Sequence, residues 1–266
     1  MVPLFQIFDK TVSIYMILGV IGVLVVMFAM YRLAVRDKLD EIEMLWMVLV
    51  SFIGVFLGGS LLYGLVNYRM ILALIRNWEQ VDSFGTFLDC ILSIFGGSVF
   101  YGGLLGMLLA IWIYRKKRRL SHRYFDAAAV GIPLFHTFGR LGCFLGGCCY
   151  GVECKFGFTY HYSLAPDANG VSRFPVQLLE ALFNACLALI LYRLFRRKKL
   201  EGRLINVYLY AYPAFRFLDE FLRGDTYRGL WWGLSTSQWI SLLIILGNTV
   251  YLLLSHKKTD KKTDAG

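Results

Sequence analysis

The chain of 266 residues is too apolar for a soluble domain: 58% of its residues are hydrophobic and only 17% are charged. This apolar surface exceeds what a water-soluble fold of this length can bury. A net charge of +10 does not indicate nucleic-acid binding, because the basic residues form short runs between apolar segments. The composition therefore predicts an integral membrane protein with no nucleic-acid partner.

Seven apolar segments predict transmembrane helices, since most approach the roughly 20 residues that a helix needs to cross the hydrocarbon. They cover residues 12–31, 44–66, 93–114, 124–145, 175–195, 204–219 and 236–255. The first segment lacks the basic flank and the cleavage site of a secretory leader, so we interpret it as a true span. We expect an all-α integral membrane protein of about seven transmembrane helices. Residues 1–255 would form a single membrane domain, and 256–266 a basic cytoplasmic tail.

Basic residues cluster after the first, third, fifth and seventh segments. These connections lie on one side of the membrane, and the positive-inside rule makes that side cytoplasmic. The N-terminus is therefore expected outside and the C-terminus in the cytoplasm. The opposite, outer connections hold most of the polar side chains, and the one at 67–89 has an apolar face at helical spacing that can lie in the membrane interface.

A glycine-rich motif, GGSVFYGGLLG, opens the third segment. Gly102 and Gly103 allow close approach of another helix or of a lipid headgroup, and helix packing is the favoured interpretation of the glycines alone. The hydroxyl of Tyr101 can serve a ligand or anchor the segment at the interface.

A second motif, FHTFGRLGCFLGGCCYG, covers residues 135–151. Arg140 lies in an apolar run, where a charge is costly unless it is paired or faces a watery cavity. Its guanidinium suits a phosphate or a carboxylate. His136 lies one helical turn earlier on the same face and is a candidate proton acceptor, although a hydrogen-bonded packing role is the commoner alternative.

Four cysteines lie in or just after this motif: Cys143, Cys148, Cys149 and Cys154. They lack the paired CxxC spacing of a structural zinc site, so no metal is expected. The six cysteines of the chain are too few and too clustered for a disulfide framework, but a single disulfide on the outer side stays open.

Two further motifs place polar residues at the outer ends of spans. In FPVQLLEALFN, Gln177 and Glu180 share one face of the helix that Pro175 begins. They are candidate site residues; the alternative is that they are ordinary polar residues of a helix end at the level of the lipid headgroups. In RFLDEFLRGD, Arg216, Glu220 and Arg223 recur at helical spacing. This second pattern predicts a carboxylate flanked by two guanidiniums, either for an anionic ligand or as a closed ion-pair network.

The order of these motifs resembles the prolipoprotein diacylglyceryl transferase family of bacterial membranes, over about residues 87–247. The resemblance implies transfer of the diacylglyceryl group of phosphatidylglycerol to the thiol of the lipobox cysteine in a preprolipoprotein. Glycerol phosphate is released and no cofactor is required. It also implies a multi-pass protein of the bacterial cytoplasmic membrane.

The resemblance also implies roles for residues. Arg140 and Arg223 match family arginines and are expected to be catalytic, with His136 and Tyr101 as candidate proton carriers. The substrate-binding candidates are Tyr15, Gly102, Gly103, Gly142, Gly147, Gly151, Gln177, Glu180, Arg216 and Glu220.

Three positions depart from the family pattern. Tyr101 stands where the family has His, Cys143 where it has Asn, and Cys148 where it has Glu. We hypothesise that His136 substitutes for the missing histidine, because it lies one turn from Arg140. The alternatives are a paralogue that moves another lipid group or uses another acceptor, a membrane thiol-redox protein, and a non-catalytic lipid-binding or transport protein. Transport is disfavoured because the chain has no inverted repeat.

Overall fold

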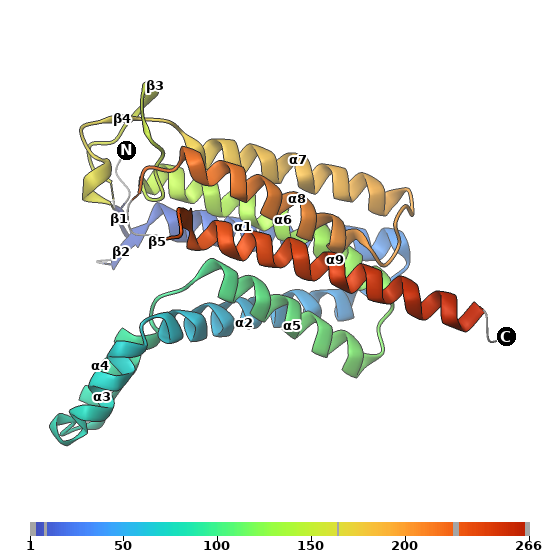
Figure 1. The fold of residues 1–266 in the computed structure, drawn as a ribbon, viewed down its shortest axis with the longest axis horizontal. Helices are drawn as coiled ribbons and strands as arrows, with labels where there is room; N and C mark the ends of the chain where they lie inside the picture. The colour runs from blue at the N-terminus through green and yellow to red at the C-terminus, as the bar shows by residue number, and fades with distance from the viewer. Residues whose placement is uncertain (1–3, 8–9, 164, 226–228, 264–266) are drawn as a thin grey trace. The chain divides into compact units, whose positions relative to one another are not determined.

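The computed structural model describes residues 4–7, 10–163, 165–225 and 229–263, and most of them are helical (Figure 1). The helices are α1 (Ile14–Asp37), α2 (Glu41–Val66), α3 (Tyr68–Arg76), α4 (Phe84–Phe95), α5 (Phe100–Arg118), α6 (His122–Gly146), α7 (Val176–Arg196), α8 (Leu204–Asp219) and α9 (Thr236–Thr263). Three 3-10 helices, η1 (Trp78–Gln80), η2 (Pro166–Ala168) and η3 (Glu220–Leu222), lie in connections.

Within the residues that the structure describes, five helices are long and apolar enough to cross a membrane: α1, α2, α6, α7 and the part of α9 up to Ser255. The bent pair of α4 and α5 adds a sixth if it is one broken span. The expected span at 204–219 is α8, which has 16 residues and is shorter than the roughly 20 that a helix needs to cross the hydrocarbon. The chain is thus a mostly helical, multi-pass membrane protein, while the count of seven spans stays a prediction.

The expected third span, 93–114, is not one straight helix. α4 ends at Phe95, α5 begins at Phe100, and their axes differ by 94°. Gly96 and Gly97 lie at the bend, where a Cβ on Gly97 would clash with the Tyr63 ring. The two glycines permit the bend and the close approach to α2, which a continuous apolar run does not reveal.

The described chain divides into two compact units, Met1–Arg32 with Asp126–Gly266, and Leu33–Phe125. In the second unit α2 packs closely on α5 along a row of glycines. A Cβ on Gly54 would lie 2.6 Å from the Gly106 carbonyl oxygen, and one on Gly106 would lie 2.8 Å from the Gly58 Cα. Only glycine allows these two backbones to come so close, as in other small-residue interfaces of membrane helices.

In the other unit α8 packs against α7 and α9 (Figure 1). Asn206 of α8 donates to Asn248 of α9 over 2.6 Å, and both side chains are buried. Asp126 near the start of α6 is fully buried and accepts hydrogen bonds from the backbone N–H groups of Gly202 and Leu204. These bonds satisfy polar groups that the interior would otherwise leave unpaired.

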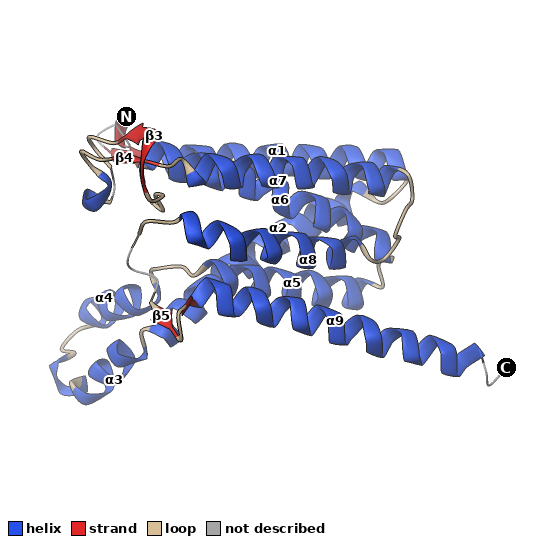
Figure 2. Ribbon diagram, turned by 45° about the horizontal axis from the view of Figure 1, so that its top comes forward, coloured by secondary structure: helices blue, strands red, loops and turns tan. Residues whose placement is uncertain are grey.

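Three small antiparallel sheets of two strands each, among the described residues, lie at one end of the helices of this unit (Figures 1 and 2). They pair β1 (Leu4–Ile7) with β2 (Lys10–Ser13), β3 (Glu153–Thr159) with β4 (Ser172–Arg173), and β5 (Leu230–Trp231) with β6 (Leu234–Ser235). In the β1–β2 sheet, Leu4 pairs with Ser13 at one end and Ile7 pairs with Lys10 at the other. The sequence prediction of an all-α fold omitted these strands, because none is longer than 7 residues.

Candidate functional site

The buried arginine of α6 is paired. The Nε atom of Arg140 lies 2.9 Å from Oε2 of Glu180, near the start of α7, and the Glu180 side chain is only 1% exposed. This ion pair provides the partner that an arginine inside an apolar segment needs. The Nη1 atom of Arg140 also lies 4.0 Å from the Sγ atom of Cys143. A guanidinium carries five N–H donors, so these contacts leave donors for an anionic ligand.

Glu180 is the centre of a larger buried group. The hydroxyl of Tyr212 on α8 donates to Glu180 Oε1 over 3.1 Å, and His136 Nε2 lies 3.5 Å from the same oxygen. The His136 and Tyr212 rings lie 4.9 Å apart, between centroids. The structure thus brings together three predicted site residues, His136, Arg140 and Glu180. Sequence reasoning missed Tyr212, whose signal is its position one turn before Arg216.

The loop after α6 is joined to the segment that carries Arg223. Gly151 and Arg223 form an antiparallel bridge, and Gly224 N donates to Tyr150 O over 3.0 Å. The guanidinium of Arg223 binds Asp225 with two hydrogen bonds of 2.9 and 2.6 Å. Burial lowers the pKa of Arg223, but the hydrogen bonds to Asp225 outweigh it and raise that pKa above its ordinary value. Arg223 is therefore a fixed cation beside the loop.

Arg216, at the end of α8, is held by acidic groups. Nη1 lies 3.2 Å from Asp219, Nη2 contacts the Glu220 carboxylate, and Nη2 is also 3.5 Å from the Ser237 hydroxyl. The predicted pair of Arg216 and Glu220 is present. The helical spacing predicted one carboxylate, Glu220, between two guanidiniums. In the structure the Arg216 guanidinium instead lies between the carboxylates of Asp219 and Glu220, and Arg223 is bound to Asp225. This arrangement fixes the end of α8.

Three predicted residues shape the loop. Gly147 has φ of +73°, and a Cβ there would lie 2.5 Å from the Ser163 hydroxyl. A Cβ on Gly151 would lie 3.1 Å from the Leu222 carbonyl oxygen, so this glycine allows the close backbone pairing. Gln177 of α7 donates to the Cys148 carbonyl over 2.8 Å. These contacts hold the loop over the start of α7.

The remaining predicted residues lie on α1, α6 and α5. Tyr15 at the start of α1 packs against Gly142, where a Cβ would lie 3.0 Å from the tyrosine ring. Tyr101, Gly102 and Gly103 are buried in α5, in the unit Leu33–Phe125. A Cβ on Gly102 would lie 2.6 Å from Leu62 of α2. Gly102 therefore serves close helix packing, which is the interpretation that the sequence favoured for these glycines.

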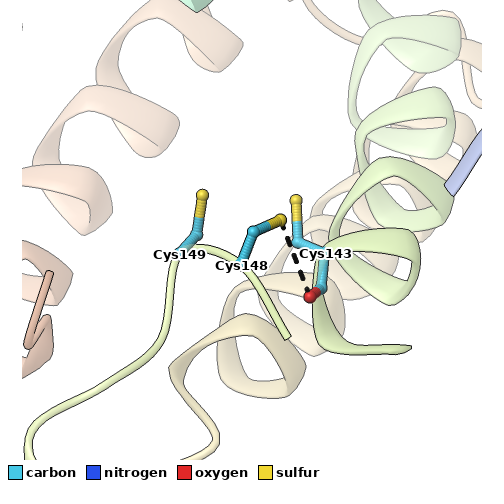
Figure 3. A group of neighbouring side chains, drawn as sticks. All are labelled: Cys143, Cys148 and Cys149. Atoms are coloured by element: carbon cyan, nitrogen blue, oxygen red, sulfur yellow. Dashed lines mark hydrogen bonds between the residues drawn. The ribbon is translucent and has the colours of Figure 1, made fainter. Parts of the chain in front are cut away.

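All six cysteines are free thiols, so the disulfide considered from the sequence is not formed in this structure. The sulfur atoms of Cys143, Cys148 and Cys149 lie within 4.8 Å of one another (Figure 3). Hydrogen bonds from Cys143 and Cys148 hold the pKa of Cys149 well below its usual range, and the charges of Arg223 and Arg140 lower that pKa further. The pKa of Cys148 rises to about 11, because the bond to Cys149 and burial outweigh the lowering by Cys143.

Comparisons with known proteins agree on one family. The family model described as prolipoprotein diacylglyceryl transferase matches residues 3–254. The chain is 32% identical to the phosphatidylglycerol--prolipoprotein diacylglyceryl transferase of Clostridium tetani, covering 93% of this chain and 95% of the relative. It is 35% identical to the Campylobacter hominis protein of the same name, covering 97% of this chain and 92% of the relative.

Proposed function

This chain belongs to the prolipoprotein diacylglyceryl transferase family and is an enzyme of lipoprotein biosynthesis, and we propose that the buried group around Arg140 is where it transfers the lipid. The donor is phosphatidylglycerol, and the acceptor that we propose is the lipobox cysteine of a preprolipoprotein. The observation that carries this proposal is the ion pair of Arg140 and Glu180, which holds a permanent cation inside the membrane domain.

The proposed role of Arg140 follows from the charge of the leaving group. The phosphodiester of phosphatidylglycerol bears one negative charge, and the departing glycerol phosphate gains a second as the carbon–oxygen bond breaks. A guanidinium fixed beside that phosphate stabilises the transition state more than the ground state. Glu180 contacts Nε, so the other donors of Arg140 can face the lipid phosphate.

Arg223 is the second proposed phosphate ligand. The loop bridge between Gly151 and Arg223 ties this cation to the loop that begins at the end of the Arg140 helix. Asp225 holds the Nε and Nη2 atoms of Arg223 through two hydrogen bonds, so Nη1 is the group that can reach a lipid phosphate.

The acceptor thiol must lose its proton to attack the glycerol carbon. We propose His136 as the nearby group that takes it, because its Nε2 lies 3.5 Å from Glu180 and a carboxylate orients and stabilises an imidazolium. The role of Tyr101 as a proton carrier stays a second prediction. In the proposed orientation, the polar end of the helices lies on the outer face of the bacterial cytoplasmic membrane. This is the face at which a secreted precursor would arrive.

The test is a transfer assay with purified protein, phosphatidylglycerol labelled in its diacylglycerol part, and a lipobox peptide. Arg140→Lys and Arg223→Lys keep the charge but lose the planar fork. Each is expected to reduce transfer by about 100-fold or more, the usual loss when one oxyanion donor is removed. Arg123→Lys is the matched control, because Arg123 pairs with Asp37 outside this group. Full activity in both site variants, in folded protein, would reject the proposed roles.

A further inference from the structure

The three neighbouring thiols of the loop are placed as ligands for one ion. Cys143 lies in the last turn of α6, and Cys148 and Cys149 follow in the loop (Figure 3). Their sulfur atoms lie within 4.8 Å of one another. Three sulfurs that surround a zinc ion at about 2.3 Å in tetrahedral geometry lie about 3.8 Å apart. Shifts of about 1 Å or less would therefore close the observed group around such an ion.

The backbone explains why the sequence spacing concealed this group. Gly147 has φ of +73° and Cys149 has φ of 56°, so two left-handed residues turn the chain back toward α6. The turn is secured by the hydrogen bond from Ser163 Oγ to Gly147 O, 2.8 Å, and by Gln177 bound to the Cys148 carbonyl. These contacts bring together cysteines that do not follow the paired CxxC pattern. The expectation of no metal rested on that pattern and on the family resemblance.

We propose that Cys143, Cys148 and Cys149 bind one soft divalent cation of the zinc class, with a fourth coordination position open to the thiol of the acceptor. Thiolates select soft and borderline cations. Among the residues that the structure describes, no His, Asp or Glu joins the three sulfurs as a fourth ligand. Three protein ligands and one open position are the arrangement of catalytic zinc sites, whereas structural sites are closed by four.

Charge and access agree with this assignment. Three thiolates around a divalent cation carry a net charge of minus one, and Arg140 Nη1 lies 4.0 Å from Cys143 Sγ. The guanidinium thus compensates that charge. Cys143 is buried, while Cys148 and Cys149 are only partly buried. A site lined in this way is shielded on one side and can be approached by a substrate on the other.

The second part of the proposal rests on the proposed transfer function. A thiol that binds the open position has its pKa lowered by the ion, so it passes its proton to His136, the proton acceptor proposed above. The acceptor sulfur then forms a bond to the glycerol carbon of phosphatidylglycerol while the carbon–oxygen bond to phosphate breaks. Glycerol phosphate leaves with the electron pair, so the step needs no oxidant or reductant. The ion supplies a thiolate at neutral pH.

The first experiment needs no lipid. Reduced, metal-free, full-length protein is titrated with Cd²⁺, whose thiolate complexes absorb in the ultraviolet, and Zn²⁺ is then added as competitor. We expect one equivalent to bind, with three sulfur neighbours by X-ray absorption. Cys148→Ser with Cys149→Ser should weaken binding by at least about 100-fold, beyond the 10–100-fold loss typical of outer-shell partners. The control variant, Cys90→Ser with Cys154→Ser and Cys186→Ser, should bind as the parent does.

A labelling measurement on the unaltered protein covers the case in which the double variant does not fold. Zn²⁺ should protect the three clustered cysteines from maleimide and leave Cys154 reactive. The metal site would be overturned if Zn²⁺ left the maleimide labelling of the three cysteines unchanged. It would also be overturned if the Cys148→Ser, Cys149→Ser variant still bound one equivalent of Cd²⁺. A cysteine peptide should then add a fourth sulfur to the bound ion, and a serine peptide should not. Equal transfer rates for metal-free and metal-loaded enzyme would overturn the role of the ion in binding the acceptor thiol. No transfer by either form would count against the proposed function, but it would not affect the evidence for metal binding from the Cd²⁺ titration.

Discussion

Replacing Glu180 by glutamine tests the ion pair at the centre of the site. Glutamine keeps the size of the side chain and can still accept the hydrogen bond from Tyr212, which spans 3.1 Å in the native protein. It removes the charge that lies 2.9 Å from Arg140 Nε, in a side chain that is 1% exposed. Breaking a buried pair in this way leaves an uncompensated charge and costs about 3–5 kcal/mol. We expect Glu180→Gln to lower the free energy of unfolding by that amount.

The assay is reversible chemical unfolding of the purified protein in detergent micelles. Glu153→Gln is the matched control, because Glu153 lies 4.0 Å from Arg173 and its side chain is 71% exposed; such surface pairs contribute about 0–1 kcal/mol. Glu180→Leu combined with Arg140→Leu should be less unstable than the two single changes predict together, since no charge is left unpaired. A loss below about 1 kcal/mol for Glu180→Gln, equal to the control, would refute the reasoning.

Three further changes test contacts within each of the two units. Asp126→Ala removes the acceptor of two backbone N–H groups at the turn between α7 and α8, and leaving them buried and unpaired should cost about 1–3 kcal/mol in the same unfolding assay. Gly147→Ala places a side chain at φ of +73°, 2.5 Å from Ser163. The strain of about 1–3 kcal/mol should appear as slower transfer and altered Cd²⁺ absorption, and parent-like values in both would contradict this account of the turn. Gly106→Leu forces a side chain into the α2 backbone and should lower the thermal midpoint, whereas the exposed change Leu109→Ala should not.

Local patterns in the sequence predicted the site where the chain is helical. Arg216 and Glu220 are four residues apart, and the structure pairs them at the end of α8. The same rule failed for Arg223, because η3 ends at Leu222 and Arg223 has extended backbone angles. Its guanidinium therefore turns to Asp225, two residues on. A helical spacing predicts contacts only as far as the helix continues.

Contacts between distant segments could not be predicted from the sequence. The depth of Arg140 indicated that a partner was needed, but nothing in the local pattern identified Glu180, 40 residues away on another helix. The cysteines show the same limit, since their association depends on the left-handed turn at Gly147. The bend at Gly96 and Gly97 was also hidden, because hydropathy reports the polarity of a segment and not its direction.

The most direct measurement is the mass of a lipobox peptide after incubation with the purified protein and phosphatidylglycerol. We expect the cysteine peptide to gain one diacylglyceryl group in place of the thiol hydrogen, with one glycerol phosphate released for each peptide modified, and we expect no change in a serine peptide. An unmodified cysteine peptide in the presence of folded, lipid-bound protein would contradict the account. Equal modification of the serine peptide would contradict the proposal that a thiol is the acceptor.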